Sequence, residues 1–490
     1  MGIAVEKDRA RRGPDAAARP VAIFSAVFAA AAIFYSFHLG RDPLGASEAY
    51  SAYAAARPSV GAIVRIPIAD DPGKQLLYYI VLHFWTKIFG AREAGLRAMS
   101  VVFGLCTLAM IFALGRDLFD DAAGAGAAAM WAFNPMATVF SFRARMYTML
   151  IAFALAHVYA FRRSRDRGGA LWTIACALTG AAVIYTHLGG VAILAAEVAI
   201  LVRDFIHGRR RIAPWLALAG AVLLFAPYLP IALAQSRVLI AGHWLDWIGP
   251  AYHYSIATKL LVTLGAAALT LWLVFGGALE PGDEPFRFCL LWIAIPILLF
   301  SAGSIAVRPM FQVRYVSPAL AMLPVLAAGL LAIAGSWVRN AIVVAVTALM
   351  LATALSIRLV NQPWGAAARM VAEADRPEQP IFFESGFVTT GEAPKVANAG
   401  FPHGYYSLPF DYYFNGANPR LTIAPEDPAA ARAEIQNAAE RTGGAWLVTW
   451  MDDAGAHAEL PDPARFTSTL RLRGERMMLF RIVPANAPPG

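Results

Sequence analysis

The chain has 490 residues, of which 58% are hydrophobic and only 15% charged, and its formal net charge is +8. A mean hydropathy of +0.53 excludes an ordinary soluble domain, because one aqueous core cannot bury so much apolar surface. The basic residues stand in short clusters between apolar stretches, which is typical of cytoplasmic loops and not of a nucleic-acid-binding surface. All three cysteines fall within apolar stretches, so no disulfide framework is predicted.

The first apolar stretch, residues 21–39, follows a basic leader at residues 1–20. Its length of about 19 residues is sufficient to cross the hydrocarbon core of a bilayer, which is about 30 Å thick. It contains aromatic residues and has no clean small-residue cleavage site, unlike a signal peptide. We therefore predict an uncleaved first span with the N-terminus in the cytoplasm.

Further apolar stretches follow as far as residue 357, and basic clusters mark alternate ends of them. The strongest internal cluster, Arg162, Arg163, Arg165 and Arg167, is expected on the cytoplasmic side. The predicted spans, about eleven in all, are 21–39, 96–118, 122–140, 148–161, 172–188, 190–202, 214–232, 257–277, 288–305, 316–337 and 341–357. An odd number of spans places the C-terminal segment on the outer side.

The last segment, residues 358–490, changes character and predicts a small soluble α/β domain with a layered sheet. Strand-like runs are expected at 380–384, 445–450 and 477–483, and helices at 364–374 and 428–440. The sequence has no Walker loop, no dinucleotide-binding glycine fingerprint and no Cys/His zinc spacing. ATP-driven and Rossmann-cofactor functions therefore lose support.

The loop between the first two spans, residues 40–97, is far longer than the usual connector of about 4–6 residues. Within it, Gly73–Phe89 is apolar and aromatic but is interrupted by Lys74, His83 and Lys87. This pattern predicts a helix that lies in the membrane surface.

Short motifs occur in a fixed order along the membrane body. They are Ser47–Ser51 (SEAYS), Leu77–Tyr79, Phe89–Gly90, Glu93, Leu96–Arg97, Arg145–Tyr147, His187 in Tyr185–His187, and Arg314–Tyr315 followed by Pro318. In order and spacing these motifs resemble the GT-C membrane glycosyltransferases, in particular the bacterial branch related to protein mannosyltransferases and the lipid A aminoarabinose transferase. The chain departs from that pattern at Ser47 in place of aspartate, at Gln75–Leu76 in place of two prolines, and at Arg143, which reverses a charge.

The resemblance implies a GT-C-like polytopic helical protein that transfers a sugar from a polyprenyl-phosphate donor to a lipid, lipopolysaccharide or protein acceptor, with inversion. An acid helps to deprotonate the acceptor hydroxyl, and arginine forks pair with the donor phosphate. The implied catalytic residues are Glu48 and Asp71, the phosphate-binding residues Arg145, Arg314, Arg143 and Lys74, and the other pocket residues Asp70, Tyr147, His187 and Tyr315. No cofactor is required by the motifs, and the resemblance leaves open a divalent metal ion.

The implied setting is the inner membrane of a bacterium. Residues 1–20 are expected in the cytoplasm, residues 21–357 as the catalytic body with its first periplasmic loop at 40–97, and residues 358–490 as a periplasmic domain. The partners are then the sugar donor, the lipid bilayer and a glycolipid or protein acceptor, without nucleic acid.

Each candidate also has a purely structural explanation. Glu48 can act as a helix N-terminal charge capped by Ser47, and Asp70–Asp71 precede a Pro-Gly turn. Lys74 can extend toward lipid headgroups, and His187 can be a packed interfacial histidine. The arginines and Tyr315 can serve as interfacial anchors.

Two other functions fit a polytopic chain with basic contacts. The first is a flippase or transporter for lipid-linked saccharides, which usually places charged residues near the membrane midplane. Here Glu197 is the main ionisable residue inside a span, and the candidate residues lie at span ends, which favours the enzyme. The second is a membrane-anchored binding protein whose working part is the C-terminal domain.

Overall fold

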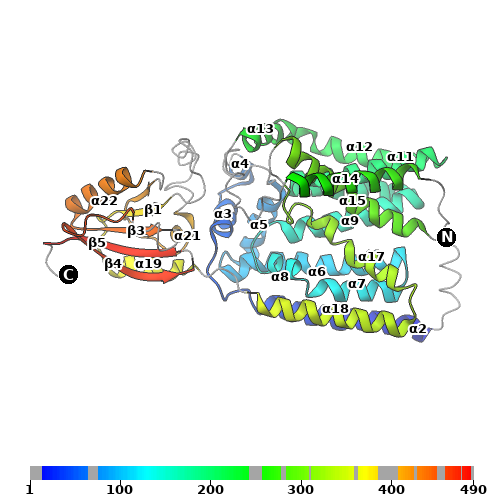
Figure 1. The fold of residues 1–490 in the computed structure, drawn as a ribbon, viewed down its shortest axis with the longest axis horizontal. Coiled ribbons are helices and arrows are strands. Elements are labelled where there is room, and N and C mark those ends of the chain that lie inside the picture. The colour runs from blue at the N-terminus through cyan, green and yellow to red at the C-terminus, as the bar shows by residue number, and fades with distance from the viewer. Residues whose placement is uncertain are drawn as a thin grey trace.

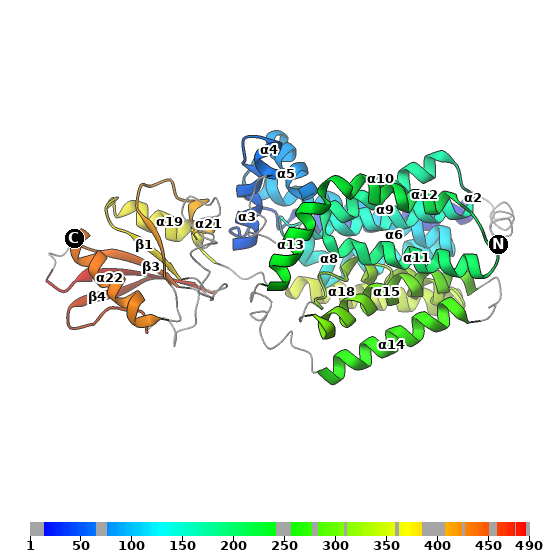
Figure 2. The same cartoon turned by 90° about the horizontal axis from the view of Figure 1, so that it is seen from above.

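The computed structural model describes residues 14–64, 76–241, 256–276, 283–307, 311–357, 362–384, 407–423, 427–449, 458–475 and 477–486. A long body of roughly parallel and antiparallel helices carries a smaller α/β domain at one end (Figures 1 and 2). The first described helix, α2 (Pro14–Ser36), begins at the other end of the body (Figure 1). The predicted boundary at residue 358 falls in the gap 358–361, outside the described residues.

Every predicted span coincides with one helix or with a broken pair of helices. The helices of the body are α2 (Pro14–Ser36), α6 (Glu93–Leu118), α7 (Asp121–Ala132), α8 (Pro135–Ser141), α9 (Tyr147–Asp166), α10 (Ala170–Thr186), α11 (Val191–Ile206), α12 (Ala213–Phe225), α13 (Leu229–Ala241), α14 (Ile256–Phe275), α15 (Glu284–Ala306), α16 (Ser317–Leu320), α17 (Leu323–Leu331) and α18 (Ser336–Ser356).

Three expected spans are interrupted, between α7 and α8, between α12 and α13, and between α16 and α17. Proline explains each break, since it has no N–H to donate to the preceding turn. Asn134 caps α8 by accepting a hydrogen bond from the N–H of Met136, with Pro135 at the first helical position. Pro227 and Pro324 stand at the other two breaks.

Six helical stretches in the described ranges are long and apolar enough to cross a membrane: 18–36, 93–118, 213–234, 258–275, 284–306 and 336–356, where 213–234 includes the 3-10 turn between α12 and α13. Shorter apolar helices occupy 76–89, 170–186 and 317–331. These findings confirm the α-helical polytopic membrane fold, and the total of about eleven spans stays a prediction.

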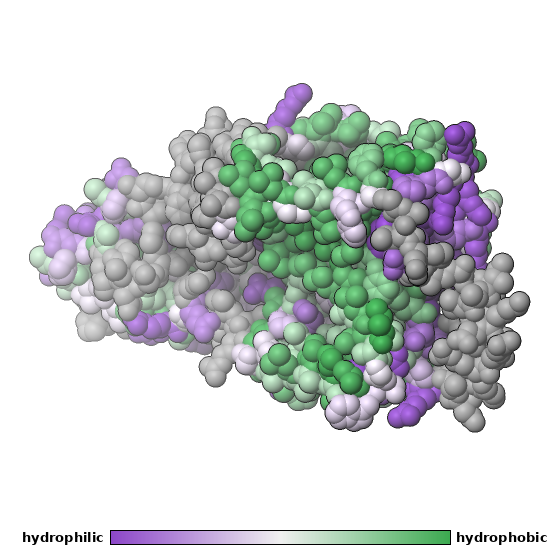
Figure 3. All heavy atoms as spheres, turned by 45° about the vertical axis from the view of Figure 1, so that its right-hand side comes forward, coloured by the Kyte–Doolittle hydropathy of each residue, from purple (hydrophilic) through white to green (hydrophobic). Residues whose placement is uncertain are grey.

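The outer face of the body is apolar, and hydrophilic residues gather toward its two ends (Figure 3). Leu223 of α12 is 71% exposed, Leu261 of α14 74% and Val344 of α18 67%, which only lipid can solvate without cost. At the end near the N-terminus, Arg165 binds Asp204 and Glu284 at 2.6 Å each. The predicted basic clusters therefore share one end of the body.

The C-terminal domain is a three-layer α/β fold around a five-stranded mixed sheet of order β2-β1-β3-β5-β4. The strands are β1 (Ile381–Glu384), β2 (Arg420–Ile423), β3 (Ala445–Thr449), β4 (Phe466–Gly474) and β5 (Met477–Pro484). β1 pairs in parallel with β2 and β3, whereas β5 runs antiparallel to β3 and β4.

Alternation along the buried strands supplies the two cores of this domain. Ile381 and Phe383 of β1 pack with helix α19 (Trp364–Glu373), while Phe382 packs with helix α22 (Pro428–Thr442) on the opposite face. The predicted soluble domain, with its three strands and two helices, is thereby confirmed. The sequence interpretation missed β2 and β4.

The C-terminal domain docks onto the first loop through the short helix α21 (Leu408–Asp411) and the two tyrosines after it. Tyr413 accepts a hydrogen bond from the N–H of Leu44 at 2.9 Å and donates one to Glu93 at 2.9 Å. Tyr412 donates to the carbonyl of Ala91 at 2.7 Å. Burial raises the pKa of Tyr413 and Glu93 raises it further, so the hydroxyl keeps the proton that it donates.

Tyr413→Phe is expected to loosen the segment before Glu48 without unfolding the domain. The change removes a hydrogen bond to Leu44, which is worth about 1 kcal/mol or roughly a fivefold change in an opening equilibrium. Hydrogen exchange at the Leu44 amide should therefore be about fivefold faster. Tyr412→Phe is the matched control, because the Tyr412 hydroxyl bonds to Ala91 and not to the Leu44 segment. Equal exchange at Leu44 in both variants would contradict the docking role.

Candidate functional site

The described part of the first loop forms three helices at the end of the body beside the C-terminal domain: α3 (Ala46–Ala55), α4 (Val60–Val64) and α5 (Leu76–Phe89) (Figures 1 and 2). Tyr50, Tyr78 and Tyr79 form an aromatic core between α3 and α5. Phe84 and Ile88 on the other face of α5 are 51% and 76% exposed. Within the described residues, a helix with one buried and one exposed face is confirmed, and its place in the membrane surface stays a prediction.

Glu48 is buried in the first turn of α3 and lies against Arg97 at the start of α6. Arg97 donates from Nε to Oε1 at 2.9 Å and from Nη2 to Oε2 at 3.0 Å. The N–H of Ala144 donates to Oε1 at 2.8 Å, and the N–H of Gly45 to Oε2 at 3.2 Å. These contacts tie together three separate segments of the chain.

All the strong acceptor positions of the Glu48 carboxylate are thus in use, since a carboxylate has about four of them. Burial would raise the pKa of Glu48, but the hydrogen bonds and charge of Arg97, the Ala144 amide and the charge of Arg143 lower it below its usual value. A carboxylate held in this way is a weak base. The catalytic role predicted for Glu48 stays a prediction, and the geometry fits a residue that positions α3.

Arg145 lies in the tight turn before α9 and is buried. Its Nη1 donates to the carbonyl of Ser47 at 2.5 Å and to the hydroxyl of Ser51 at 3.3 Å, so α3 fixes the guanidinium. Arg143 precedes it, close enough for its charge to act on Glu48. Nε of Arg143 is buried and has no hydrogen-bond partner among the described residues.

Arg314 approaches the same place from the segment between α15 and α16. Arg145 and the Tyr147 side chain lie near it, and its guanidinium stacks over the Tyr315 ring at 5.2 Å. Its Nε is buried and also lacks a hydrogen-bond partner in the described part of the chain. His187 lies with its ring centroid 5.1 Å from that of Tyr315, and its Nδ1 accepts a hydrogen bond from the N–H of Gly189.

The structure therefore brings together seven of the predicted residues at one end of the helical body. They are Glu48, Arg143, Arg145, Tyr147, His187, Arg314 and Tyr315. Asp70, Asp71 and Lys74 lie outside the described residues, so their predicted roles stay predictions.

Two residues of the site were missed as candidates. Arg97 belongs to the Leu96–Arg97 motif. An arginine near the start of a long apolar helix indicates a buried acidic partner, and this signal could have identified it. Tyr78 is buried in α5, and the hydroxyls of Ser51 and Ser100 lie near its own hydroxyl. The charge of Arg145 acts on Tyr78, which places this hydroxyl at the arginine cluster.

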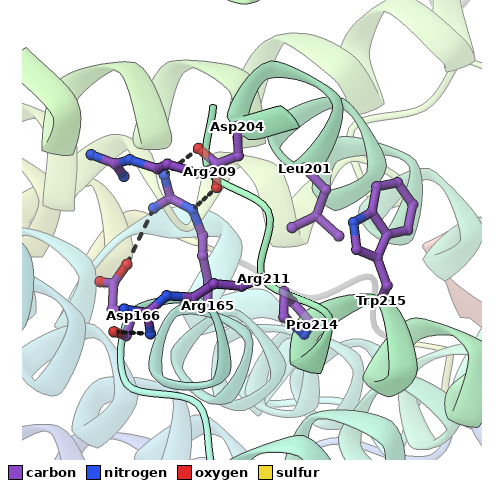
Figure 4. Close-up of a pocket in the computed structure, with 8 residues that line it drawn as sticks. All are labelled: Arg165, Asp166, Leu201, Asp204, Arg209, Arg211, Pro214 and Trp215. Carbon is purple, nitrogen blue, oxygen red and sulfur yellow. Dashed lines mark hydrogen bonds and ion pairs between the residues drawn. The ribbon is translucent and has the colours of Figure 1, made fainter. Parts of the chain in front are cut away.

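A cavity of about 280 Å³ lies at the opposite end of the body, lined by residues of α9, α11, α12 and the loop between the last two (Figure 4). Arg165 lies in the last turn of the 20-residue helix α9, and Arg145 lies just before its first turn, so the two arginines are about 30 Å apart along the helix. In this cavity Arg165 pairs with Asp204, and Arg211 donates to the carbonyl of Asp166. The cavity is therefore separate from the predicted site.

The fold and part of the sequence are similar to those of known membrane glycosyltransferases. The family model described as Dolichyl-phosphate-mannose-protein mannosyltransferase matches residues 70–231. The chain is similar to the structure of ArnT from Cupriavidus metallidurans in the apo state, with a TM-score of 0.61 and 16% identity over 97% of this chain and 100% of that one.

A second similar structure is ArnT from Cupriavidus metallidurans bound to undecaprenyl phosphate, with a TM-score of 0.54 and 16% identity over 96% of this chain and 99% of that one. No curated protein matches by sequence. These comparisons confirm the resemblance that the motifs indicate, and at this identity the structural likeness establishes the fold.

Proposed function

We propose that the chain is an inverting glycosyltransferase that moves a sugar from a polyprenyl-phosphate donor to a lipid, lipopolysaccharide or protein acceptor. The observation that carries the proposal is the cluster of Arg143, Arg145 and Arg314, in which two buried Nε donors have no partner within the described ranges. Buried donors of this kind are costly unless an anion receives their hydrogen bonds. A phosphate diester or monoester supplies such an anion.

The polyprenyl chain is supported by the fold and by one neighbour. The matched family is described by a dolichyl-phosphate donor, and one ArnT structure holds undecaprenyl phosphate. The arginines lie at the end of the apolar body, where a lipid phosphate would stand with its chain along the exposed apolar helices (Figure 3). A prenyl donor thus accounts for both the charge and its location.

The proposed chemistry follows from the donor phosphate that the guanidinium groups would bind. When the bond between the anomeric carbon and the phosphate oxygen breaks, the leaving phosphate gains negative charge, which Arg145 and Arg314 are placed to stabilise. The acceptor hydroxyl attacks the opposite face of the anomeric carbon and loses its proton to a base, for which Asp71 is our candidate. A divalent metal ion at this place stays a prediction.

We also propose the bacterial inner membrane as the location. The N-terminus and the arginine clusters near it would face the cytoplasm, and the C-terminal domain and arginine cluster of the site would face the periplasm (Figure 1). The Tyr413 contacts to Leu44 and Glu93 support a C-terminal domain that lies beside the acceptor side of the site.

The test is a transfer assay with the purified full chain in lipid nanodiscs. Donors would be undecaprenyl phosphates that carry radiolabelled sugars, and acceptors would be lipids extracted from a deletion strain of the source bacterium. We expect label to move to an acceptor fraction, and the glycolipid mass profile of the deletion strain to lack the same product. Movement of labelled donor between leaflets without transfer would instead support a flippase and overturn the proposal.

A further inference from the structure

A second polar cluster lies within the helical body, away from the arginine site. His157 of α9, Cys176 of α10 and Glu197 of α11 are all fully buried. His157 Nε2 lies 2.9 Å from Glu197 Oε2, and His157 Nδ1 lies 3.6 Å from the sulfur of Cys176. One donor atom from each residue lies within 4.8 Å of the other two.

The other carboxylate oxygen of this cluster lacks a partner. Glu197 Oε1 is buried and has no hydrogen bond within the described residues. Unpaired carboxylate oxygens are costly in the interior of a membrane protein, where no water replaces the lost bonds. The pair with His157 therefore satisfies only half of the Glu197 carboxylate.

Helix α10 is shaped around the imidazole. A Cβ at Gly180 would lie 2.8 Å from Cε1 of His157, so only glycine lets the two helices approach this closely. Thr179 on the preceding position places its hydroxyl 3.2 Å from His157 Nδ1. The cluster is thus a packed constellation of three helices and has a fourth oxygen beside it.

We propose that His157, Cys176 and Glu197 bind a structural zinc ion. Thiolate, imidazole and carboxylate are the ligands that zinc prefers. Zinc–sulfur and zinc–nitrogen bonds of about 2.3 and 2.0 Å in a tetrahedron separate the two ligand atoms by about 3.5 Å, which is close to the 3.6 Å between Cys176 Sγ and His157 Nδ1. One imidazole binds an ion through a single nitrogen, so Glu197 must turn away from Nε2 and toward the ion to complete three ligands. The Thr179 hydroxyl lies beside the fourth position.

The charges of this site suit a dry environment. One thiolate and one carboxylate balance the two positive charges of the ion, and neutral imidazole adds none, so the complex is neutral overall. On binding, the Cys176 thiol releases its proton to solvent, which makes the affinity fall as the pH falls.

The ion would act on structure and not on sugar transfer. His157 lies ten residues after Tyr147 on α9, which is about 15 Å along the helix from the arginine site. A zinc ion here joins α9, α10 and α11, the three consecutive helices that follow the Arg145 turn. The inference is therefore independent of the proposed function.

Metal analysis of the full chain tests the site directly. Protein purified without chelator from zinc-supplemented cells is expected to hold about one zinc per chain, and Cys176→Ser less than about a tenth of that. Cys289→Ser is the matched control, because Cys289 is equally buried in α15 but outside the cluster. Gel filtration and thermal melting confirm that each variant is folded.

Cobalt substitution supplies a second readout that does not depend on stoichiometry. The cobalt-loaded chain is expected to show a thiolate-to-cobalt charge-transfer band that Cys176→Ser abolishes and Cys289→Ser retains. Equal zinc content in the wild type and Cys176→Ser would overturn the proposal. So would loss of the ion in His187→Ala with retention in Cys176→Ser, because that result places the metal at the arginine site.

Discussion

Arg314→Ala is expected to lower the rate of sugar transfer by about 10²–10³-fold, which is the usual cost of removing one preorganised donor from a developing negative charge. Arg314 is the preferred target because its buried Nε has no hydrogen-bond partner among the described residues. The substitution therefore removes no hydrogen bond that Nε makes within the described part of the chain. The rate loss should appear in kcat measured with saturating donor. Melting temperature should change little.

The conservative change separates charge from geometry. Arg314→Lys keeps the positive charge but loses the planar fork, so we expect an intermediate rate, about tenfold below the wild type. The control is Arg210→Ala, at the opposite end of the body, where the guanidinium stacks on Phe205 at 5.2 Å and has no hydrogen bond or ion pair among the described residues. Wild-type kcat in Arg314→Ala would remove this residue from the site.

Much of the fold is predictable from hydropathy because lipid imposes a strong constraint on backbone. Residues 21–39 and 341–357 could be placed as spans since only a helix satisfies its own N–H and C=O groups in hydrocarbon. The breaks near Asn134, Pro227 and Pro324 were not predicted. A single proline changes the mean hydropathy of a span very little. The break that it causes, by removing one backbone hydrogen bond, therefore cannot be detected from hydropathy.

The site was predictable as a set of motifs but not as a set of contacts. Glu48 and Arg97 are 49 residues apart, and nothing in either motif shows that their side chains meet. The strand β2 was missed for the same reason, since Arg420–Ile423 is short and its pairing with β1 is not local. His157 and Cys176 could not be distinguished from other residues of apolar helices. Glu197 alone was noted, as the main ionisable residue inside a predicted span.

Glu48→Ala is expected to destabilise the chain by about 3–5 kcal/mol, because it leaves the buried Arg97 guanidinium without its carboxylate. Thermal melting in detergent measures the loss. Glu440→Ala is the matched control. It breaks an ion pair with Arg465 in which both side chains are about half exposed, and such pairs contribute about 0–1 kcal/mol.

The acid side of the stability profile supplies a second measurement. Because folding lowers the pKa of Glu48, its stabilisation is present above the unfolded value of 4.5 and is lost as the pH falls through the lower folded value. Glu48→Gln should therefore flatten the loss of stability below pH 4.5. The wild type should keep the steeper dependence.

Glu48→Gln also decides between positioning and base catalysis. The amide has nearly the same shape and keeps an oxygen for Arg97 and Ala144, so a positioning residue retains a transfer rate within about tenfold of the wild type. A general base cannot be replaced by an amide, and its loss costs about 10²–10⁴-fold. A fall of that size with an unchanged melting temperature would restore Glu48 as the base. The retained rate would instead show that the ion pair with Arg97 sets the position of α3, and through the Ser47 carbonyl that of Arg145.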